Sequence, residues 1–318
     1  MVTGGAGYIG SVVTSRLCEE GYNTIVIDDL RDGKRQAVNP SAILYEFDFG
    51  NLVELTKVFK SNTIECVLHL AASANVPDSV INPREYYQNN LASTLNLLNA
   101  MRDAGVQNII FSSTAAVYGE PEYNPIDENH RTSPINPYGW SKLFIEQMLK
   151  DYSKAYGLKY IIFRYFCAAG ATQTNGESRS YESHLIPVIL DTLLHKRDKI
   201  HVFGKNYNTI DGTGVRDYIH VKDIANAHIL ALQNLDINHN HVLNLGSNKS
   251  YSVMQVISKV EQHLKQKVNY VIDEPRPGDP ATLTTTCEKA KKVIGWEPKN
   301  DLEDILMSAY NWRKNPLY

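Results

Sequence analysis

Val2-Thr3-Gly4-Gly5-Ala6-Gly7-Tyr8-Ile9-Gly10-Ser11 is the stretch that decides the fold of this chain. Gly4, Gly7 and Gly10 lie three residues apart, between a short apolar start and an amphipathic run from residue 12 to residue 20. This order is typical of a strand that turns sharply into a helix whose N-terminus faces a pyrophosphate. A glycine triplet alone is a weak indication of a dinucleotide, because tight turns also need glycine. The rest of the chain has to strengthen the prediction.

Length, charge and cysteine content limit the class of protein. The 318 residues suffice for one large domain or two smaller ones, and the net charge of −3 argues against a nucleic-acid partner. No apolar run reaches the roughly 18 residues of a membrane span, and we expect no signal peptide and a cytoplasmic protein without a membrane partner. The spacing of the four cysteines fits neither a disulfide framework nor a metal site, and predicts reduced thiols. They are Cys18, Cys66, Cys167 and Cys287.

A pair of carboxylates follows the second expected strand, residues 24–27, about 20 residues beyond the glycines. Asp28, with Asp29 beside it, is placed to accept hydrogen bonds from an adenosine ribose, and its charge would repel a 2′-phosphate. The pattern therefore favours NAD over NADP, although an acidic turn after a strand is also common. Basic residues follow at once and leave NADP open: Arg31, Lys34 and Arg35.

Strands and helices alternate through the first half of the chain. We expect strands at 43–47, 66–70 and 108–111, and helices at 51–60 and 83–104. This alternation predicts parallel strands with right-handed crossovers, and hence a doubly wound α/β sheet of the Rossmann type. Ligands of such sheets lie outside the carboxyl ends of the strands. The segments at those ends support a dinucleotide site: Gly4–Gly10, Asp28, Asp48, Ala71–Ala74 and Ser112–Thr114.

Asn136-Pro137-Tyr138 begins the segment with candidate catalytic residues. Asn favours the N-cap position and Pro the first helical position, so we expect a helix from here to about residue 156. Tyr138 and Lys142 then share one helical face. The helix dipole and the neighbouring ammonium group predict a lowered pKa for the Tyr138 phenol, as a base near neutral pH requires.

The Tyr-x-x-x-Lys spacing by itself proves little, because it occurs three times in this sequence. Tyr218 lies in an expected strand, and Lys222 follows the start of the next helix. Tyr310 and Lys314 lie on the expected C-terminal helix, where we expect a surface pair. Only the Tyr138 pair follows a strand that ends in hydroxyl residues within the nucleotide-binding pattern, and this context selects it.

The pattern changes after an expected strand at 158–165. A polar stretch at 172–183 indicates a domain boundary, and we predict an NAD-binding domain at 1–166 and a smaller mixed α/β substrate-binding domain at 167–318. The segment around 214–245 is a candidate to pack back on the first domain. The expected elements of this half are strands at 200–203, 241–245 and 268–272, and helices at 185–195, 221–235, 252–265, 287–294 and 302–312.

Two arginines of this half lie beside glycine or proline turns. Arg216 follows Gly214, and Arg276 lies between two prolines. Such guanidinium groups are well placed to bind phosphate oxygens bidentately. A surface salt bridge, such as one between Arg216 and Asp217, is an equally good interpretation of the spacing alone.

Several segments of this chain occur together in one enzyme family. They are Gly4–Gly10, Asn89-Asn90, Ser112–Gly119, the Tyr138/Lys142 pair, Gly212–His220 and Arg276–Asp279. Together they resemble the UDP-glucose 4-epimerase family of the extended short-chain dehydrogenase/reductases, over nearly the whole chain. Gly-Thr-Gly-Val-Arg-Asp-Tyr-Ile-His at 212–220 is the most specific of these segments.

The resemblance implies an isomerase that acts on a UDP-hexose with tightly bound NAD, which is recycled in each turnover. Tyr138 would take the proton from the 4-hydroxyl, assisted by Thr114, while Lys142 holds the nicotinamide ribose. The implied NAD contacts also include Gly4, Gly7, Tyr8, Ile9, Gly10, Asp28, Asp29, Asp48, Phe49, Leu70, Ala71, Ala72, Ala74, Asn89 and Phe166. The implied substrate contacts, with Thr114 and Tyr138, are Cys167, His184, Leu185, His201, Phe203, Arg216, Arg276, Asp279 and Leu283.

The resemblance further implies a homodimer through the helices near 83–104 and 138–156. Three departures bear on activity: Cys167 stands where the family usually has Asn, Leu283 favours a plain hexose over an N-acetylhexosamine, and Met1–Thr3 can supply only a short central strand. The alternatives are a UDP-N-acetylhexosamine 4-epimerase, a nucleotide-sugar 4,6-dehydratase or decarboxylase, and a non-catalytic NAD-binding protein. Ala115-Ala116 after Thr114 argues against the dehydratase and decarboxylase, which need a carboxylate there.

Overall fold

Seven parallel strands form the main sheet of the computed structural model, which describes residues 1–179, 182–235, 239–276 and 279–318. Their order is β10-β6-β5-β4-β1-β2-β3, and β1 is paired to both β2 and β4. The chain order therefore reverses at β1, where doubly wound sheets form their ligand crevice. The predicted Rossmann-type sheet is confirmed. Its strands are β1 (Val2–Thr3), β2 (Ile25–Asp28), β3 (Ile43–Glu46), β4 (Val67–His69), β5 (Asn108–Thr114), β6 (Lys159–Tyr165) and β10 (His241–Leu245).

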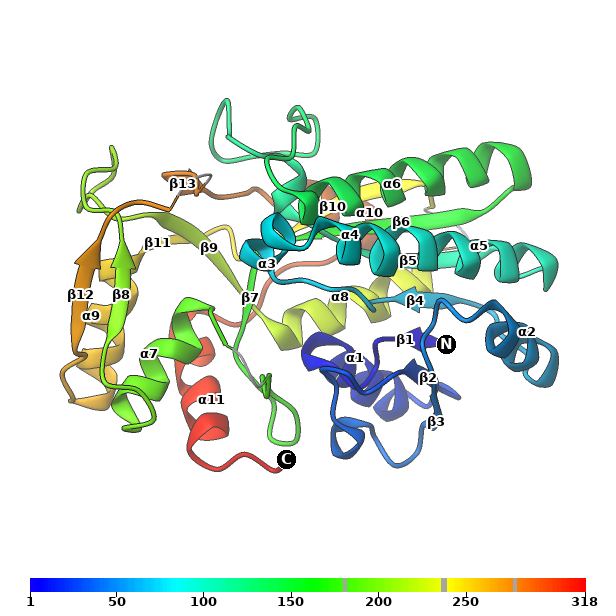
Figure 1. The fold of residues 1–318 in the computed structure, drawn as a ribbon, viewed down its shortest axis with the longest axis horizontal. Helices are drawn as coiled ribbons and strands as arrows, with labels where there is room; N and C mark the ends of the chain where they lie inside the picture. The colour runs from blue at the N-terminus through cyan, green and yellow to red at the C-terminus, as the bar shows by residue number, and fades with distance from the viewer. Residues whose placement is uncertain (180–181, 236–238, 277–278) are drawn as a thin grey trace.

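Successive side chains of these strands enter two different cores, as the period of a strand requires. Leu68 and Ile161 pack toward one set of helices, and Val67 and Ile162 pack toward the other. Figure 1 shows α5 and α6 on one side of the sheet and α1 with α8 on the other. The first set is α1 (Tyr8–Glu19), α8 (Val221–Asn234) and α10 (Glu288–Ile294), and the second is α2 (Leu52–Ser61), α5 (Ser93–Asp103) and α6 (Pro137–Tyr156).

The predicted start of α6 is confirmed at its N-cap. The side-chain oxygen of Asn136 accepts a hydrogen bond of 2.8 Å from the backbone N–H of Gly139, and Pro137 occupies the first helical position. The helix ends where Gly157 adopts the left-handed conformation with φ of 73°. Tyr138 therefore lies in the first turn of a long helix, and Lys142 lies one turn further on.

The helix expected at 83–104 is confirmed in its extent, but it is not α-helical throughout. The structure has α3 (Val76–Ile81), α4 (Pro83–Tyr86), a π-helical turn (Tyr87–Ala92) and then α5. The π-helical turn contains the buried Asn90, whose amide oxygen accepts from Ser73 N–H and whose amide nitrogen donates to Ser73 C=O. These hydrogen bonds to a distant loop accompany the change from an α-helical to a π-helical turn. The spacing of apolar residues in the sequence does not reveal such a change.

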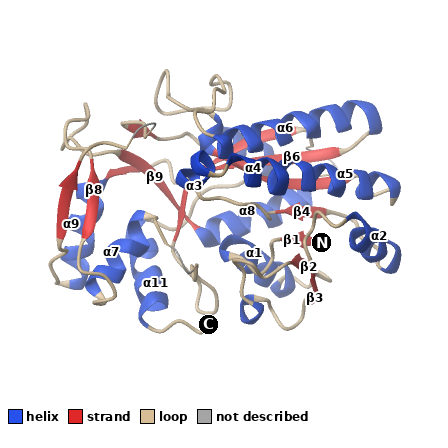
Figure 2. Ribbon diagram, in the orientation of Figure 1, coloured by secondary structure: helices blue, strands red, loops and turns tan. Residues whose placement is uncertain are grey.

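The second half of the chain builds a smaller unit beside the main sheet, as Figure 2 shows. Its strands are β7 (Cys167–Ala169), β8 (Ile200–Phe203), β9 (Val215–His220), β11 (Ser250–Ser252), β12 (Tyr270–Asp273) and β13 (Thr282–Leu283). Its helices are α7 (Leu185–Leu193), α9 (Val253–Leu264) and α11 (Leu302–Lys314). A separate apolar core joins α7, α9 and α11 with β8. The segment 214–245 is shared, because β9 pairs with β7 and β11 while β10 joins the main sheet.

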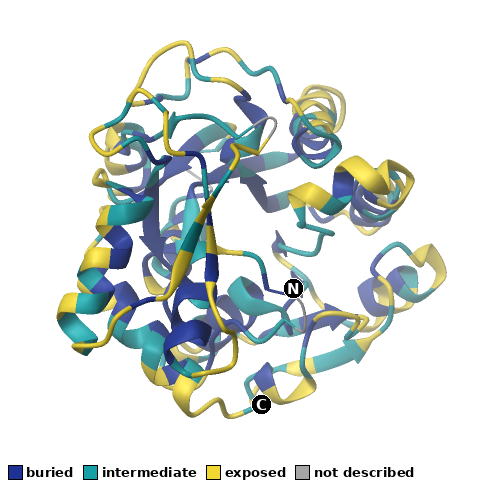
Figure 3. Cartoon of the chain, turned by 60° about the vertical axis from the view of Figure 1, so that its left-hand side comes forward, coloured by how far each residue is buried: buried dark blue, intermediate teal, exposed yellow. Residues whose placement is uncertain are grey.

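Buried residues concentrate along the strands and on the inner faces of the helices (Figure 3). In the described part of the chain, no helix has the length and apolar character that a membrane span requires. Short 3-10 turns at Arg35–Ala37 and Ala115–Val117 follow β2 and β5. The second of these turns directs the chain away from the sheet immediately after Thr114.

Candidate active site

A cavity of 330 Å³ lies between the carboxyl ends of the main sheet and the second unit. The structure brings together here many of the residues predicted for cofactor, substrate and catalysis. They are Tyr8, Ile9, Ala74, Thr114, Tyr138, Phe166, Cys167, His184, Asp279 and Leu283. Segments far apart in the sequence therefore meet at one site, in the crevice that this sheet topology provides.

The glycine loop has the shape that a pyrophosphate site requires. Gly4 has a φ of 73°, and a Cβ atom there would lie 2.6 Å from the backbone nitrogen of Ala71. A Cβ on Gly10 would lie 1.9 Å from the carbonyl oxygen of Gly4, so this glycine allows α1 to pack against the loop. Gly7 is the N-cap of α1, and the nearest atom to an added Cβ is 3.4 Å away. Space and the free N–H groups of a helix start thus coincide at Gly7, and they fit a phosphate group.

Asp28 lies at the end of β2 and is almost fully buried. Its carboxylate accepts hydrogen bonds of 2.9 Å from the backbone N–H groups of Ala6 and Leu30. Burial raises the pKa of Asp28, and these two hydrogen bonds counteract the shift. The side chain therefore holds the glycine loop in place, and its remaining lone pairs can accept from a ribose. Asp29 instead forms an ion pair of 2.9 Å with Arg31.

The other predicted cofactor residues lie along the neighbouring strand ends. Asp48 and Asn89 line a second, more open cavity of 870 Å³. Asn89 donates a 2.9 Å hydrogen bond to the hydroxyl of Ser73, in the loop after β4. Phe49 is buried against the ring of His69. Leu70, Ala71 and Ala72 begin the loop that follows β4, and the N–H of Leu70 donates to Thr3 C=O over 3.1 Å.

Thr114, Tyr138 and Lys142 converge from β5 and α6. Tyr138 packs edge-on against Tyr86, with ring centroids 6.4 Å apart. Lys142 is 2% exposed, and its Nζ donates to the carbonyl oxygen of Ser112 over 2.8 Å and lies over the ring of Phe111. Thr114 lines the same cavity as Tyr138, and its hydroxyl lowers the pKa of the Tyr138 phenol.

The expected lowering of the Tyr138 pKa is wrong for the protein without cofactor. Burial raises the pKa of Tyr138, while the hydrogen bond from Thr114 and the charge of Arg179 lower it to a lesser extent. Burial also lowers the pKa of Lys142 to about 7, so its positive charge is partly lost at neutral pH. The expectation rested on the helix dipole and the neighbouring charge, whereas desolvation has the largest effect on the pKa of both Tyr138 and Lys142.

A buried ion pair that sequence reasoning missed supports the catalytic segment. Arg164 of β6 binds both carboxylate oxygens of Glu146 on α6, at 3.0 and 2.6 Å, and Ser113 donates to Glu146 over 2.6 Å. Glu146 and Arg164 are both almost completely buried. Breaking such a pair would leave an uncompensated charge, so it holds α6 against β5 and β6. The sequence contains no local signal for a pair 18 residues apart.

The predicted substrate residues divide into two groups. Cys167, His184, Asp279 and Leu283 line the cavity, and Asp279 forms an ion pair with Arg216 of β9. Burial raises the pKa of the Cys167 thiol to about 11, which keeps it protonated. Among the described residues, the predicted contacts that lie off this cavity are Leu185, His201, Phe203, Arg216 and Arg276.

The residues off the cavity have other partners in the second unit. Leu185 begins α7 and packs against the core around that helix. His201 shares a 2.6 Å hydrogen bond with Asp273, and the guanidinium of Arg276 lies 3.7 Å from the ring centroid of Phe203. The Pro-Gly turn at 277–278, which suggested a phosphate-binding arginine, lies outside the described residues.

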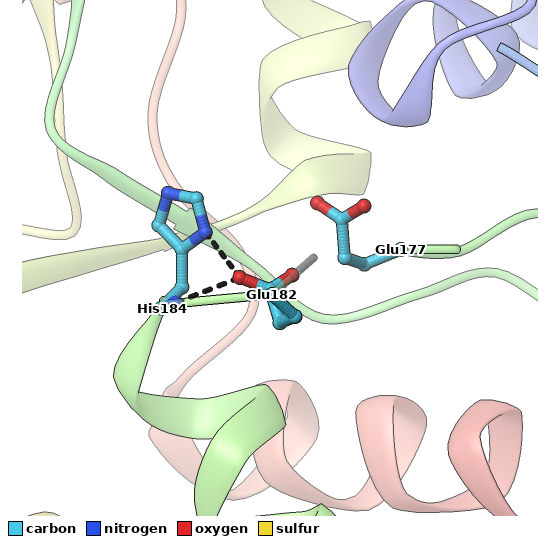
Figure 4. A group of neighbouring side chains, drawn as sticks. All are labelled: Glu177, Glu182 and His184. Atoms are coloured by element: carbon cyan, nitrogen blue, oxygen red, sulfur yellow. Dashed lines mark hydrogen bonds and ion pairs between the residues drawn. The ribbon is translucent and has the colours of Figure 1, made fainter. Parts of the chain in front are cut away.

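Two carboxylates in the loop before α7, Glu177 and Glu182, were also missed, because the polar stretch there indicated only a domain boundary; they lie close to His184, which was predicted as a substrate contact. Figure 4 shows Glu177, Glu182 and His184 directed toward one another. One oxygen of Glu182 accepts from the backbone N–H groups of Ser183 and His184 and shares a 2.6 Å hydrogen bond with His184 Nδ1. Their potential metal-ligand atoms lie within 4.8 Å of one another. Arg179 lies in the same loop and forms a 3.6 Å ion pair with Glu177.

The chain is similar to proteins of one family over nearly its whole length. A family model described as the NAD dependent epimerase/dehydratase family matches residues 1–246. A UDP-glucose 4-epimerase from Azospirillum brasilense is 43% identical over 99% of this chain and 92% of its own length. One from Halalkalibacterium halodurans is 44% identical over 99% of this chain and 95% of its own. The crystal structure of the Bifidobacterium longum enzyme with NAD+ and UDP has a TM-score of 0.94 and 37% identity, and covers 99% of this chain and 98% of that one.

Proposed function

The chain belongs to the NAD dependent epimerase/dehydratase family, and we propose that it interconverts UDP-glucose and UDP-galactose at carbon 4 of the hexose. The observation that carries this proposal is the convergence of Tyr138 and Thr114 in one cavity with the start of α1. Proteins that match almost the whole chain at 43–44% identity are named for this activity. The protein is therefore an isomerase of nucleotide sugars.

The geometry assigns a task to each catalytic side chain. Tyr138 acts as the base in its deprotonated, phenolate form: it takes the proton of the 4-hydroxyl and returns it later. Thr114 interacts with the same phenol and opposes the rise of its pKa. NAD held in this site would supply the hydride acceptor and donor that a change of configuration at carbon 4 requires. Lys142 lies one helical turn from Tyr138, where its ammonium group can bind ribose hydroxyls. Gly7, Tyr8 and Asp28 hold the dinucleotide.

If the UDP group stays bound while the hexose rotates in the site, the enzyme keeps the binding energy of the UDP group throughout the reaction. Asp279 and Leu283 line the end of the cavity where we assign the nucleotide sugar, and Arg216 is paired with Asp279. Leucine at 283 occupies more of the cavity than a smaller residue would, and this favours a plain hexose over an N-acetylhexosamine. Ala115 and Ala116, which follow Thr114, offer no carboxylate for an elimination, so a 4,6-dehydratase is less well supported.

Incubation of the purified protein with UDP-galactose, without added NAD, tests this function. We expect UDP-glucose to form until the two sugars reach equilibrium, because the cofactor is recycled rather than consumed. Added NAD should change the rate only by filling empty sites. A protein that binds NAD but forms no UDP-glucose, even with NAD present, would be a non-catalytic NAD-binding protein and would contradict the proposal.

A homodimer through α5 and α6 is part of the proposal. The exposed residues Leu95 on α5 and Trp140 and Phe144 on α6 support it, and the rings of Trp140 and Phe144 lie 5.5 Å apart. Such neighbouring apolar side chains often mark an interface between subunits. Light scattering of the purified protein should give twice the mass of one chain. Phe144→Glu should give the mass of one chain, whereas a wild-type monomer would contradict the assignment.

A cytoplasmic location completes the proposal. The four cysteines, all among the described residues, form no disulfide bond with one another: Cys18, Cys66, Cys167 and Cys287. Thiols persist in reducing compartments, and disulfides are typical of oxidising ones. A fusion of this chain to a fluorescent protein should therefore fractionate with cytoplasmic markers, and recovery with secreted proteins would contradict the location.

A further inference from the structure

Arg179 lines the cavity and has no role in the function proposed above. It is one of two arginines among the described residues that line the cavity, and the other is Arg313. Arg313 binds both carboxylate oxygens of Asp191, so its guanidinium is already paired on two sides. Among the described residues, the ion pair of Arg179 is a 3.6 Å contact with one oxygen of Glu177, and its side chain is 32% exposed. Its guanidinium therefore has donors available for a ligand.

The segment that carries Arg179 is attached to both halves of the molecule, and we call its described residues, 172–179 and 182–184, the strap. On one side, the side chain of Asn175 donates to Ala37 C=O over 2.7 Å and accepts from the hydroxyl of Ser15 on α1 over 3.1 Å. Asn175 is 2% exposed. These contacts attach the strap to the same helix whose first turn follows the glycine loop.

On its other side, the strap is held by the C-terminal part of the chain. Trp312 Nε1 donates to Glu177 C=O over 3.0 Å, and the Tyr318 hydroxyl accepts from Gly176 N–H over 3.2 Å. A Cβ on Gly176 would lie 2.4 Å from the ring of Trp312, so the strap backbone lies directly against that ring. In Figure 4, Glu177 lies between the ribbons of α1 and α11. The strap therefore presents Arg179 from a fixed backbone.

The surroundings of Arg179 indicate which ligand it binds. It lines the cavity together with Tyr8 and Ile9, the first two residues of α1. Its charge acts on Tyr8, Asp32 and Tyr138. Asp32 precedes Gly33, which packs against Asp28 at the end of β2 and against Ala6 of the glycine loop. By contrast, the charges that act on Cys167, which lines the same cavity, include those of Arg216 and Asp279 and not that of Arg179.

We propose that Arg179 donates hydrogen bonds to a phosphate oxygen of the dinucleotide pyrophosphate, in the cavity that it lines together with the first residues of α1. This inference rests on the proposed function for the identity of the cofactor. The glycine loop offers backbone N–H groups, and Arg179 adds a full positive charge with a planar set of donors. Glu177 orients the arginine through its own contact and through a 3.0 Å hydrogen bond from Arg179 N–H. Retention of NAD then depends on both halves of the chain.

Binding of NAD to cofactor-free protein, followed by calorimetry, tests the proposal. Arg179→Gln should weaken NAD binding about 10- to 100-fold, the usual effect of a lost charge-assisted hydrogen bond. Arg179→Lys should lie between wild type and Arg179→Gln. The matched control is Arg197→Gln, which removes an exposed arginine that donates to Glu182 C=O at the end of the strap but does not line the cavity. NAD binding by this control should stay within about twofold of wild type.

Binding of UDP to the NAD-loaded variants distinguishes the two diphosphates of the reaction. We expect UDP affinity to be unchanged in Arg179→Gln. Loss of UDP affinity with normal NAD binding would assign Arg179 to the nucleotide sugar and overturn the proposal. Normal binding of both ligands, with only a lower melting temperature, would show that the arginine is structural and overturn it too. Wild-type protein that binds NAD without epimerising UDP-galactose would contradict the proposed function but not the role of Arg179.

Discussion

The ammonium group of Lys142 donates a 2.8 Å hydrogen bond to the carbonyl oxygen of Ser112, at the end of the strand that carries Thr114. This bond directs the lysine toward the sheet, next to the position that we propose for a ribose of the cofactor. The same location buries the ammonium group almost completely and lowers its pKa to about 7. The buried Lys142 therefore makes folding less favourable at neutral pH, because the lysine is fully protonated in the unfolded chain and loses part of its charge on burial.

Replacing Lys142 by Met should stabilise the cofactor-free protein at pH 7. In the unfolded chain the lysine keeps its proton up to its ordinary pKa of 10.5, whereas in the folded protein it loses the proton near pH 7, so wild-type stability rises with pH between these values. The advantage of the variant should shrink by about 1.4 kcal/mol per pH unit from pH 7 toward pH 10. Urea unfolding of both proteins at pH 7, 8 and 9 measures it. An advantage that does not change with pH would contradict the lowered pKa.

Tyr138→Phe should abolish epimerisation and leave NAD bound. The change removes the phenol oxygen that takes the proton, and such a group contributes about 10²- to 10⁴-fold to a rate. The ring, which packs against Tyr86, stays in place. Turnover of UDP-galactose and the NAD content of the purified variant are the two measurements. Loss of NAD with the ring intact would mean that Tyr138 holds the cofactor rather than moving the proton.

Gly7→Ala and Gly10→Ala should have different effects, although both glycines belong to one loop. An added Cβ at position 7 meets its nearest atom at 3.4 Å, so the fold should survive while NAD binding weakens. At position 10 the Cβ would lie 1.9 Å from a carbonyl oxygen, so the melting temperature of the cofactor-free protein should fall. Thermal unfolding and NAD titration separate the two effects. Equal loss of stability in both variants would contradict the assignment of Gly7 to the pyrophosphate.

Cys167→Asn should lower the KM for UDP-galactose about two- to tenfold, the usual value of one added hydrogen bond. The thiol lines the cavity and is a weak hydrogen-bonding group, whereas an amide both donates and accepts. Cys167→Ala is the control, and its KM should remain close to that of wild type. If the Asn variant binds substrate no better than the Ala variant, position 167 does not contact the sugar nucleotide.

Much of the first half of the fold was predictable from local patterns. The alternation of apolar runs located β2 to β6 within a few residues, and Asn136 with Pro137 located the start of α6. The π-helical turn at Tyr87–Ala92 was not predictable, because it accompanies hydrogen bonds between Asn90 and Ser73. In the second half, the short strands β7, β11 and β13 have few residues each and are defined by their pairing with β9.

The candidate site was predictable where a motif is continuous in the sequence. The structure brings Thr114, Tyr138 and Cys167 to one cavity, but His201 and Arg276 face other partners. Arg179 was not predicted as a site residue, because a single arginine in a polar stretch forms no motif that would indicate a binding function. Only its position between α1 and α11 gives it a candidate function.

The sequence by itself determined the strand-glycine-helix unit, the parallel sheet and the helical face that carries Tyr138 and Lys142, because each depends on residues that are close along the chain. The tertiary structure decided the charge state of those two side chains and the attachment of the strap that presents Arg179. Burial depends on what packs against a group from remote segments, and desolvation changes a pKa by more than the nearby dipoles and charges that a sequence reveals.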